Sequence, residues 1–110
     1  MNWKKMESLA DLSEAIEESR DKKVVIFKHS TRCSVSMMAK KSLEMSWDIS
    51  SDEVQPYFLD LIKHRDVSNE IAEKLEVIHQ SPQLIGVNNE EVFYHASHSV
   101  ISVESLKSAL

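Results

Sequence analysis

The chain has little of what cross-links or interrupts a fold: it contains one cysteine, one glycine and two prolines in 110 residues. A single cysteine allows no internal disulfide, which is typical of a protein from a reducing compartment. There is no stretch of about 18 consecutive apolar residues, so we expect no membrane span and no membrane partner. The N-terminal residues 1–7 lack the apolar stretch of a signal peptide. Together these absences favour a cytoplasmic protein.

Basic charge is also in deficit. The chain has 18 acidic residues against 13 Lys and Arg, a formal net charge of -5, which argues against nucleic acid as a partner. Hydrophobic residues make up 42% and charged residues 28%, the proportions of an ordinary globular protein. The length is close to the commonest size of one domain. We therefore expect a single domain over residues 1–110, acting as a monomer.

Hydrophobic spacing predicts alternating helices and strands. Apolar residues recur on one face of a helix over residues 8–19. The continuous apolar run of residues 24–27 is typical of a buried central strand. Similar reasoning gives the other elements: helix 34–47, strand 54–62, helix 67–75, strands 84–87 and 92–95 joined by an Asn88-Asn89 turn, and a last helix capped by Ser102.

This order, α-β-α-β-α-β-β-α, contains a β-α-β unit, whose crossover is right-handed and whose two strands are parallel. The last two strands form an antiparallel hairpin. We therefore expect an α/β fold in which a mixed four-stranded sheet has helices on its faces.

The only cysteine, Cys33, lies where a strand-like run ends and a helix-like run begins. Unpaired backbone N–H groups and the positive end of the macrodipole at a helix start favour the reactive thiolate. Three residues on, where a dithiol enzyme would have its second cysteine, the chain has Ser36. The motif is C-x-x-S, a nucleophilic thiol without a resolving partner. The alternative is that Cys33 is a small buried apolar residue.

Positive charge gathers around this cysteine. Residues 24–43 contain no Asp or Glu, whereas Lys28, Arg32, Lys40 and Lys41 all fall there. A local positive field in an acidic protein would stabilise a thiolate and attract anionic thiols. We expect Arg32 to support the thiolate or to pair with carboxylates of a small thiol. Otherwise these basic residues form an ordinary solvated face.

Four strings, in order along the chain, resemble those of one family. They are FKHSTRCSVS at residues 27–36, VSNEIA at 67–72, HQSPQ at 79–83 and HASH at 95–98. With the element order, they resemble the YtxJ-like monothiol bacilliredoxins, which have a thioredoxin-like three-layer α/β/α sandwich. The likeness spans nearly the whole chain. One departure is Ser34, which stands where the family usually has Pro and adds a hydroxyl and a backbone donor near the sulfur.

The resemblance implies a cytoplasmic thiol–disulfide oxidoreductase whose nucleophile, Cys33, removes bacillithiol from mixed disulfides on client proteins. Bacillithiol, a low-molecular-weight thiol, is then a co-substrate, and no cofactor is bound. Pro82 would be cis and face the thiol, and the backbone of Ser81 would pair with a substrate chain as a short strand does. Otherwise Pro82 only begins a strand. Ser36 would donate a hydrogen bond to the thiolate or satisfy the helix backbone.

Two other functions are open. One is a glutathione-linked monothiol glutaredoxin-like enzyme, or a related iron–sulfur cluster carrier, although such carriers usually have Gly after the active cysteine. The other is an interaction or stress protein of the same fold without redox activity.

Five histidines raise the question of a metal site, but four well-placed ligands are not evident and we expect no bound metal. Met37, Met38 and Met45 are expected to fill the core.

Overall fold

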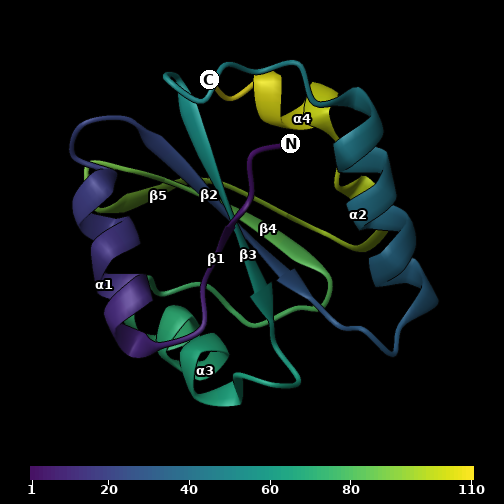
Figure 1. Cartoon of the computed structure of the whole chain (residues 1–110), viewed down its shortest axis with the longest axis horizontal. Helices are drawn as coiled ribbons and strands as arrows, with labels where there is room; N and C mark the ends of the chain where they lie inside the picture. Colours follow the sequence, from purple (N-terminus) through teal and green to yellow (C-terminus); the bar gives the residue numbers. More distant parts are fainter.

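The computed structural model describes residues 1–110 and shows a sheet between two pairs of helices (Figure 1). The strands are β1 (Lys4–Lys5), β2 (Lys23–His29), β3 (Val54–Asp60), β4 (Gln83–Asn88) and β5 (Glu91–Ser97). The helices are α1 (Leu9–Glu18), α2 (Ser34–Ser46), α3 (Arg65–Lys74) and α4 (Val103–Lys107), with a 3-10 helix η1 (His98–Val100) before α4. None of these helices has the length and apolar character needed to cross a membrane.

The sheet is mixed, and its strands lie in the order β1-β3-β2-β4-β5. β2 runs parallel to β3 and antiparallel to β4, and β5 is antiparallel to β4. β2 is therefore the central strand, as its apolar run predicts. The predicted α/β class and three layers are confirmed, because α1 and α3 cover one face of the sheet and α2 and α4 cover the other (Figure 1).

The sheet has five strands rather than the predicted four, because Lys4 and Lys5 pair in parallel with Tyr57 and Phe58. Next to this pair, the N–H of Met6 donates to the carbonyl oxygen of Phe58 at 2.8 Å, and Met6 is fully buried. Two consecutive lysines carry no apolar alternation that would predict a strand. A short, charged strand of this kind is typical of a sheet edge.

Alternate residues of β2 enter two separate cores. Val24 and Ile26 belong to the apolar cluster under α1 and α3, whereas Val25 and Phe27 belong to the cluster under α2 and α4. Successive residues of a strand point to opposite faces of the sheet, which explains this division. The same alternation sets the direction of the last two residues of β2, next to the single cysteine.

Serine caps fix two helix starts close to the predicted ones. At α1, the Ser8 hydroxyl accepts a hydrogen bond from the N–H of Asp11 at 3.1 Å. At α4, the Ser102 hydroxyl accepts from the N–H of Ser105 at 3.0 Å. Both caps satisfy an N–H group that the helix itself leaves unpaired.

The turn between β4 and β5 lies one residue further along than predicted. Asn89 and Glu90 occupy it, with φ of 52° and 68°. Both N–H groups donate to Ser19 at the end of α1, Asn89 to the carbonyl oxygen at 2.7 Å and Glu90 to the hydroxyl at 2.9 Å. This tertiary contact places Glu90 in a left-handed conformation that residue preference alone assigns to Asn.

The only glycine, Gly86, lies in β4 against an aromatic ring. A Cβ at this position would be 2.7 Å from Cζ of Phe93 on β5. The register against β5 also shifts between Gly86 and Val87. The glycine therefore allows the ring to approach the strand backbone closely.

Candidate active site

Cys33 lies in the connection from β2 to α2, as its N-cap residue. Its N–H donates to the carbonyl oxygen of Ser30 at 3.2 Å, which closes a four-residue turn. Its own carbonyl oxygen accepts from the N–H of Met37 at 3.1 Å. The thiol is free and half-buried. The predicted place of Cys33 at a helix start is confirmed.

The N-terminus of α2 carries no group that competes with a thiolate. The cap residue makes no side-chain hydrogen bond, and the first turn contains no acidic residue. The first N–H groups of a helix have no intrahelical acceptor and carry the positive end of the macrodipole. Ser34 is the first helical residue and is exposed. The residue that carries the thiol therefore lies at a helix start with partly unsatisfied donors and no acidic side chain.

Ser36 is fully buried and braces the turn that carries the cysteine. Its hydroxyl oxygen accepts from the N–H of Ser30 at 3.0 Å and lies 2.7 Å from Nδ1 of His29. These hydrogen bonds join the end of β2 to the first turn of α2. In this structure Ser36 therefore acts on Cys33 through the turn, and its hydrogen bonds go to the turn and to His29 rather than to the sulfur.

His29, the last residue of β2, is a contributor to the site that the sequence did not single out for this role. It is 5% exposed, and its ring lies 5.7 Å from the ring of Phe27 and 5.3 Å from that of Phe58. Burial, helped by the nearby charge of Lys40, lowers the pKa of His29. The imidazole is therefore neutral at pH 7, which suits a hydrogen bond shared with the Ser36 hydroxyl.

Arg32, the residue before the cysteine, is a basic residue without an ion-pair partner. Its side chain is exposed and makes no hydrogen bond or ion pair, whereas Lys40 pairs with Glu44 at 2.9 Å. The expectation that Lys28 adds to a positive field at the cysteine needs correction. Lys28 is fully buried and donates to the Ser68 carbonyl oxygen of α3 at 3.1 Å. It points to the opposite face of the sheet because it precedes His29 in the strand.

The segment Ser81-Pro82 lies at the same edge of the sheet as the cysteine. β2 and β4 are antiparallel with Lys28 opposite Gln83, so the end of β2 lies beside the start of β4. Pro82 immediately precedes Gln83, just as the turn with Cys33 follows β2. Sequence and topology therefore bring this segment next to the thiol-bearing turn.

The Ser81–Pro82 peptide bond is cis, as the resemblance implies. Pro82 is buried, whereas Ser81 is half-buried. The carbonyl oxygen of Pro82 accepts from the N–H of His98 at 3.0 Å, and His98 has φ of 57°. The start of β4 is thus joined to η1.

A groove runs beside the start of α2. It encloses about 330 Å³ between the exposed side chains of Val35 and Met38 on α2 and His98 and Ser99 of η1.

The prediction that Met37, Met38 and Met45 fill the core is wrong, because these residues are 56%, 72% and 77% exposed, respectively. No group of three or more His, Cys, Asp or Glu side chains is arranged to hold a metal ion.

The fold and this site define a thioredoxin-fold protein with a single thiol at the first strand-to-helix connection of its central strand. One solved structure, described provisionally as an oxidoreductase with a thioredoxin fold, is 33% identical, with a TM-score of 0.81 over 98% of this chain and 93% of its own. A thioredoxin from Malassezia sympodialis shares the fold at 19% identity, with a TM-score of 0.76 over 99% of this chain and 87% of its own.

The family model described as monothiol bacilliredoxin BrxC matches residues 4–106. The chain therefore belongs to the monothiol bacilliredoxin family. The resemblance found in the sequence is confirmed over almost the full length.

Proposed function

We propose that this protein is a monothiol thiol–disulfide oxidoreductase that removes bacillithiol from mixed disulfides on client proteins. The observation that carries the proposal is the position of Cys33, the only thiol in a chain of this family, at the uncapped start of α2. A helix N-terminus favours the thiolate, which is the form that attacks a disulfide.

The transfer takes place in two exchanges. The thiolate of Cys33 attacks the bacillithiol sulfur of the mixed disulfide, so a Cys33–bacillithiol bond forms while the client sulfur leaves as a thiolate and takes a proton from water. A second bacillithiol thiolate then attacks the adduct, which restores the Cys33 thiolate and releases bacillithiol disulfide. Ser36 has no sulfur, so this second thiol, or a reductase in its place, comes from outside the chain.

Two neighbouring groups have roles in binding under this proposal. The unpaired guanidinium of Arg32 pairs with a carboxylate of bacillithiol, since a planar guanidinium binds carboxylates in two-point contacts. The backbone of Ser81, at the same sheet edge, pairs with the extended client chain. Ser34 is the first residue of α2, and under this proposal its hydroxyl and N–H support the thiolate.

We further propose that the protein works as a monomer in the cytoplasm, with no bound cofactor. A free, half-exposed thiol suits a reducing compartment, where it is not consumed by disulfide formation. Size-exclusion chromatography with and without a reductant checks the monomer, because a dimer that disappears on reduction would be a disulfide artefact of Cys33. A dimer that persists in reductant would contradict it.

The deciding experiment is intact-protein mass spectrometry of the reduced protein mixed with a bacillithiolated client. We expect a bacillithiol adduct on Cys33 together with loss of the adduct from the client, and neither change with Cys33→Ala. The same client carrying glutathione is the matched comparison. Transfer of glutathione alone would replace bacillithiol by glutathione in the proposal. No transfer from either client would leave an interaction protein of this fold without redox activity.

A further inference from the structure

Two fully buried polar side chains face each other across β2 and β4. Lys28 and Gln83 are register partners in this antiparallel pair, with 0% and 1% of each residue exposed. Side chains of directly opposed residues project from the same face of a sheet, here the face covered by α3. Both therefore reach the loop between α3 and β4, which ends in Ser81 and Pro82.

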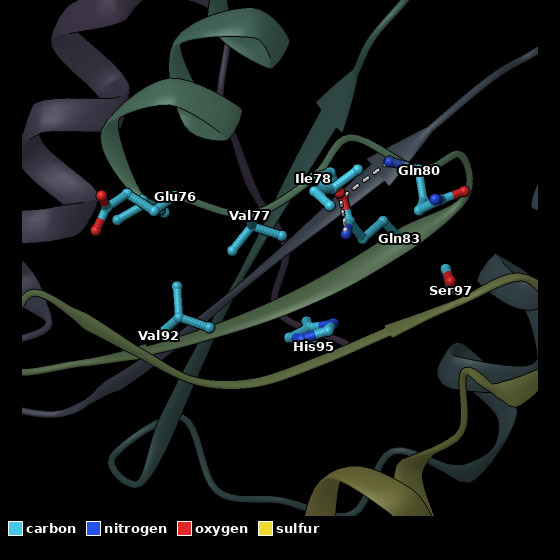
Figure 2. Close-up of a pocket in the computed structure, with 9 residues that line it drawn as sticks. Glu76, Val77, Ile78, Gln80, Gln83, Val92, His95 and Ser97 are labelled. Carbon is cyan, nitrogen blue, oxygen red and sulfur yellow. Dashed lines mark hydrogen bonds between the residues drawn. The ribbon is translucent and has the colours of Figure 1, made fainter.

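The oxygen and the nitrogen of the Gln83 side-chain amide both form hydrogen bonds with the backbone of that loop. Its Oε1 accepts from the N–H of Gln80 at 3.3 Å, and its Nε2 donates to the carbonyl oxygen of Ile78 at 3.1 Å. Figure 2 shows both bonds, with the loop forming one wall of a pocket of about 550 Å³. Ile78 is 83% exposed, so the loop has no apolar anchor between the buried residues Val77 and Pro82.

Lys28 contacts His79, the loop residue between Ile78 and Gln80. Its Nζ lies 3.2 Å from Nδ1 of His79 and 3.1 Å from the carbonyl oxygen of Ser68, and the Ser68 hydroxyl lies 3.5 Å from the same Nδ1. Burial, together with the charges of Lys28 and Arg65, lowers the pKa of His79. Neutral His79 can therefore accept a hydrogen bond from the Lys28 amine at Nδ1.

No counter-ion offsets the charge of Lys28. No carboxylate lies within ion-pair distance of its amine, and burial lowers its pKa to about 8. A buried ammonium without a counter-ion is costly, and an apolar side chain of the same length would fill the strand position better. The residue therefore weakens the core while it holds the loop.

We propose that Lys28 and Gln83 are positioning residues for the thiol transfer, which fasten three consecutive loop residues, Ile78 to Gln80, so that the Ser81 backbone stays aligned with a client chain beside Cys33. This rests on the proposed function. The far side of the segment is already fixed by the bond from His98 to Pro82. Lys28 and Gln83 thus hold the loop residues before Ser81, whereas His98 holds Pro82 after it.

Lys28→Met tests the proposal, since it keeps the length of the side chain and removes the amine. We expect the free energy of unfolding to stay equal or to rise, because a desolvated charge is lost. The kcat/KM for a bacillithiolated client protein should fall about tenfold or more, mainly through KM. Release of a thiol from a small disulfide, and alkylation of Cys33 by iodoacetamide, should change less than about twofold, because neither needs backbone pairing with Ser81.

A second pair of variants acts from the exposed side of the contact. His79→Leu removes the acceptor and should reproduce the loss on the client protein, whereas His79→Gln provides an amide oxygen and should restore most of it. Gln83→Met should also speed amide hydrogen exchange in residues 78–81. Gln55→Met is its matched control, since Gln55 is also buried but bonds to Asn2 and Pro56 at the opposite end of the sheet. Lys74→Met, on the surface of α3, is the control for lysine removal.

The outcomes separate the two proposals. If the wild-type protein transfers no thiol, the proposed function fails, whatever the variants do. If wild type transfers and Lys28→Met and His79→Leu match it on the client protein, the positioning role is wrong. If these variants lose stability and lose activity on small and protein disulfides alike, the pair has only a structural role, which also overturns the inference.

Discussion

The Ser36 hydroxyl lies 2.7 Å from Nδ1 of His29, and both side chains are buried. Ser36 occupies the position at which a dithiol enzyme has its resolving cysteine. In this chain the position is used to join the central strand to the helix that carries Cys33. The absence of a resolving thiol is therefore coupled to a structural function, because the hydroxyl also accepts from the N–H of Ser30.

Replacing this hydroxyl should destabilise the protein. Ser36→Ala leaves the Ser30 N–H and the His29 ring nitrogen without their partner in a buried place, which costs about 1–3 kcal/mol. Urea unfolding, followed by circular dichroism, measures the loss as a lower midpoint with an unchanged slope. Ser46→Ala, at the exposed end of α2, is the control and should be neutral. Equal midpoints for the two variants would contradict the bracing role.

The residue after the cysteine offers a test of the helix terminus. Ser34→Pro should raise the free energy of unfolding by about 0.4–1 kcal/mol, because Pro is pre-organised for the first helical position and that N–H lies outside the helix ladder. It also removes one donor beside the sulfur. The rate of Cys33 alkylation at pH 7 should fall roughly two- to tenfold, the equivalent of one hydrogen bond. Ser34→Ala separates the hydroxyl from the N–H, and if it alone reproduces the loss, the backbone donor is not responsible.

The stability of the protein should rise with pH above neutrality because of Lys28. Its pKa is about 8 in the folded protein, whereas in the unfolded chain the amine has its ordinary pKa of about 10.4. Between these values the unfolded chain binds a proton that the folded chain has lost, so the free energy of unfolding increases as pH rises. Below about pH 8 this contribution is absent, since both states hold the proton.

Denaturant unfolding between pH 7 and 9.5 gives the free energy of unfolding of wild type and Lys28→Met at each pH. The contribution of the amine is the difference between the slopes of these two free energies against pH. The upper limit avoids Tyr57, because burial and the neighbouring Glu18 raise the pKa of its hydroxyl and give stability the opposite dependence above about pH 10. Parallel pH profiles for the two proteins would show that the Lys28 amine is not desolvated in the folded state.

A methyl group at the single glycine should disturb the β4–β5 hairpin. Gly86→Ala places a Cβ at 2.7 Å from the Phe93 ring, and overpacking of this kind costs about 1–3 kcal/mol. Phe93→Leu, which removes the ring, should reduce the cost of Gly86→Ala. Thermal unfolding of the four proteins of this double-mutant cycle gives the coupling energy. Additive losses would place the strain elsewhere than in the ring contact.

The sequence was sufficient for those features that depend on local pattern. The apolar run before Cys33 predicts the central strand, and the hydrophobic spacing from Ser34 onward predicts the helix start at the cysteine. Ser102 predicted the last helix through its capping preference. The cis bond at Pro82 came from the family resemblance, because the residue pair alone favours trans.

Other features depend on contacts between distant segments, which no local pattern contains. β1 is a strand because Lys4 and Lys5 reach the edge of β3, although neither residue favours a sheet. Sequence proximity places Lys28 in the positive field at the thiol, because it does not reveal that the side chain points to the other face of the sheet. The partner of Ser36 could have been suspected from strand alternation, which directs His29 toward the α2 side.

The register of β2 decides where its last two side chains, Lys28 and His29, point. Because Lys28 and His29 are neighbours, one points to the loop that precedes β4 and the other to the first turn of α2. A slip of a single residue against β4 would exchange these directions and bury the wrong group on each side. Insertions or deletions in β2 should therefore abolish thiol transfer even where the sheet still forms, so the spacing between this strand and Cys33 admits no change in length.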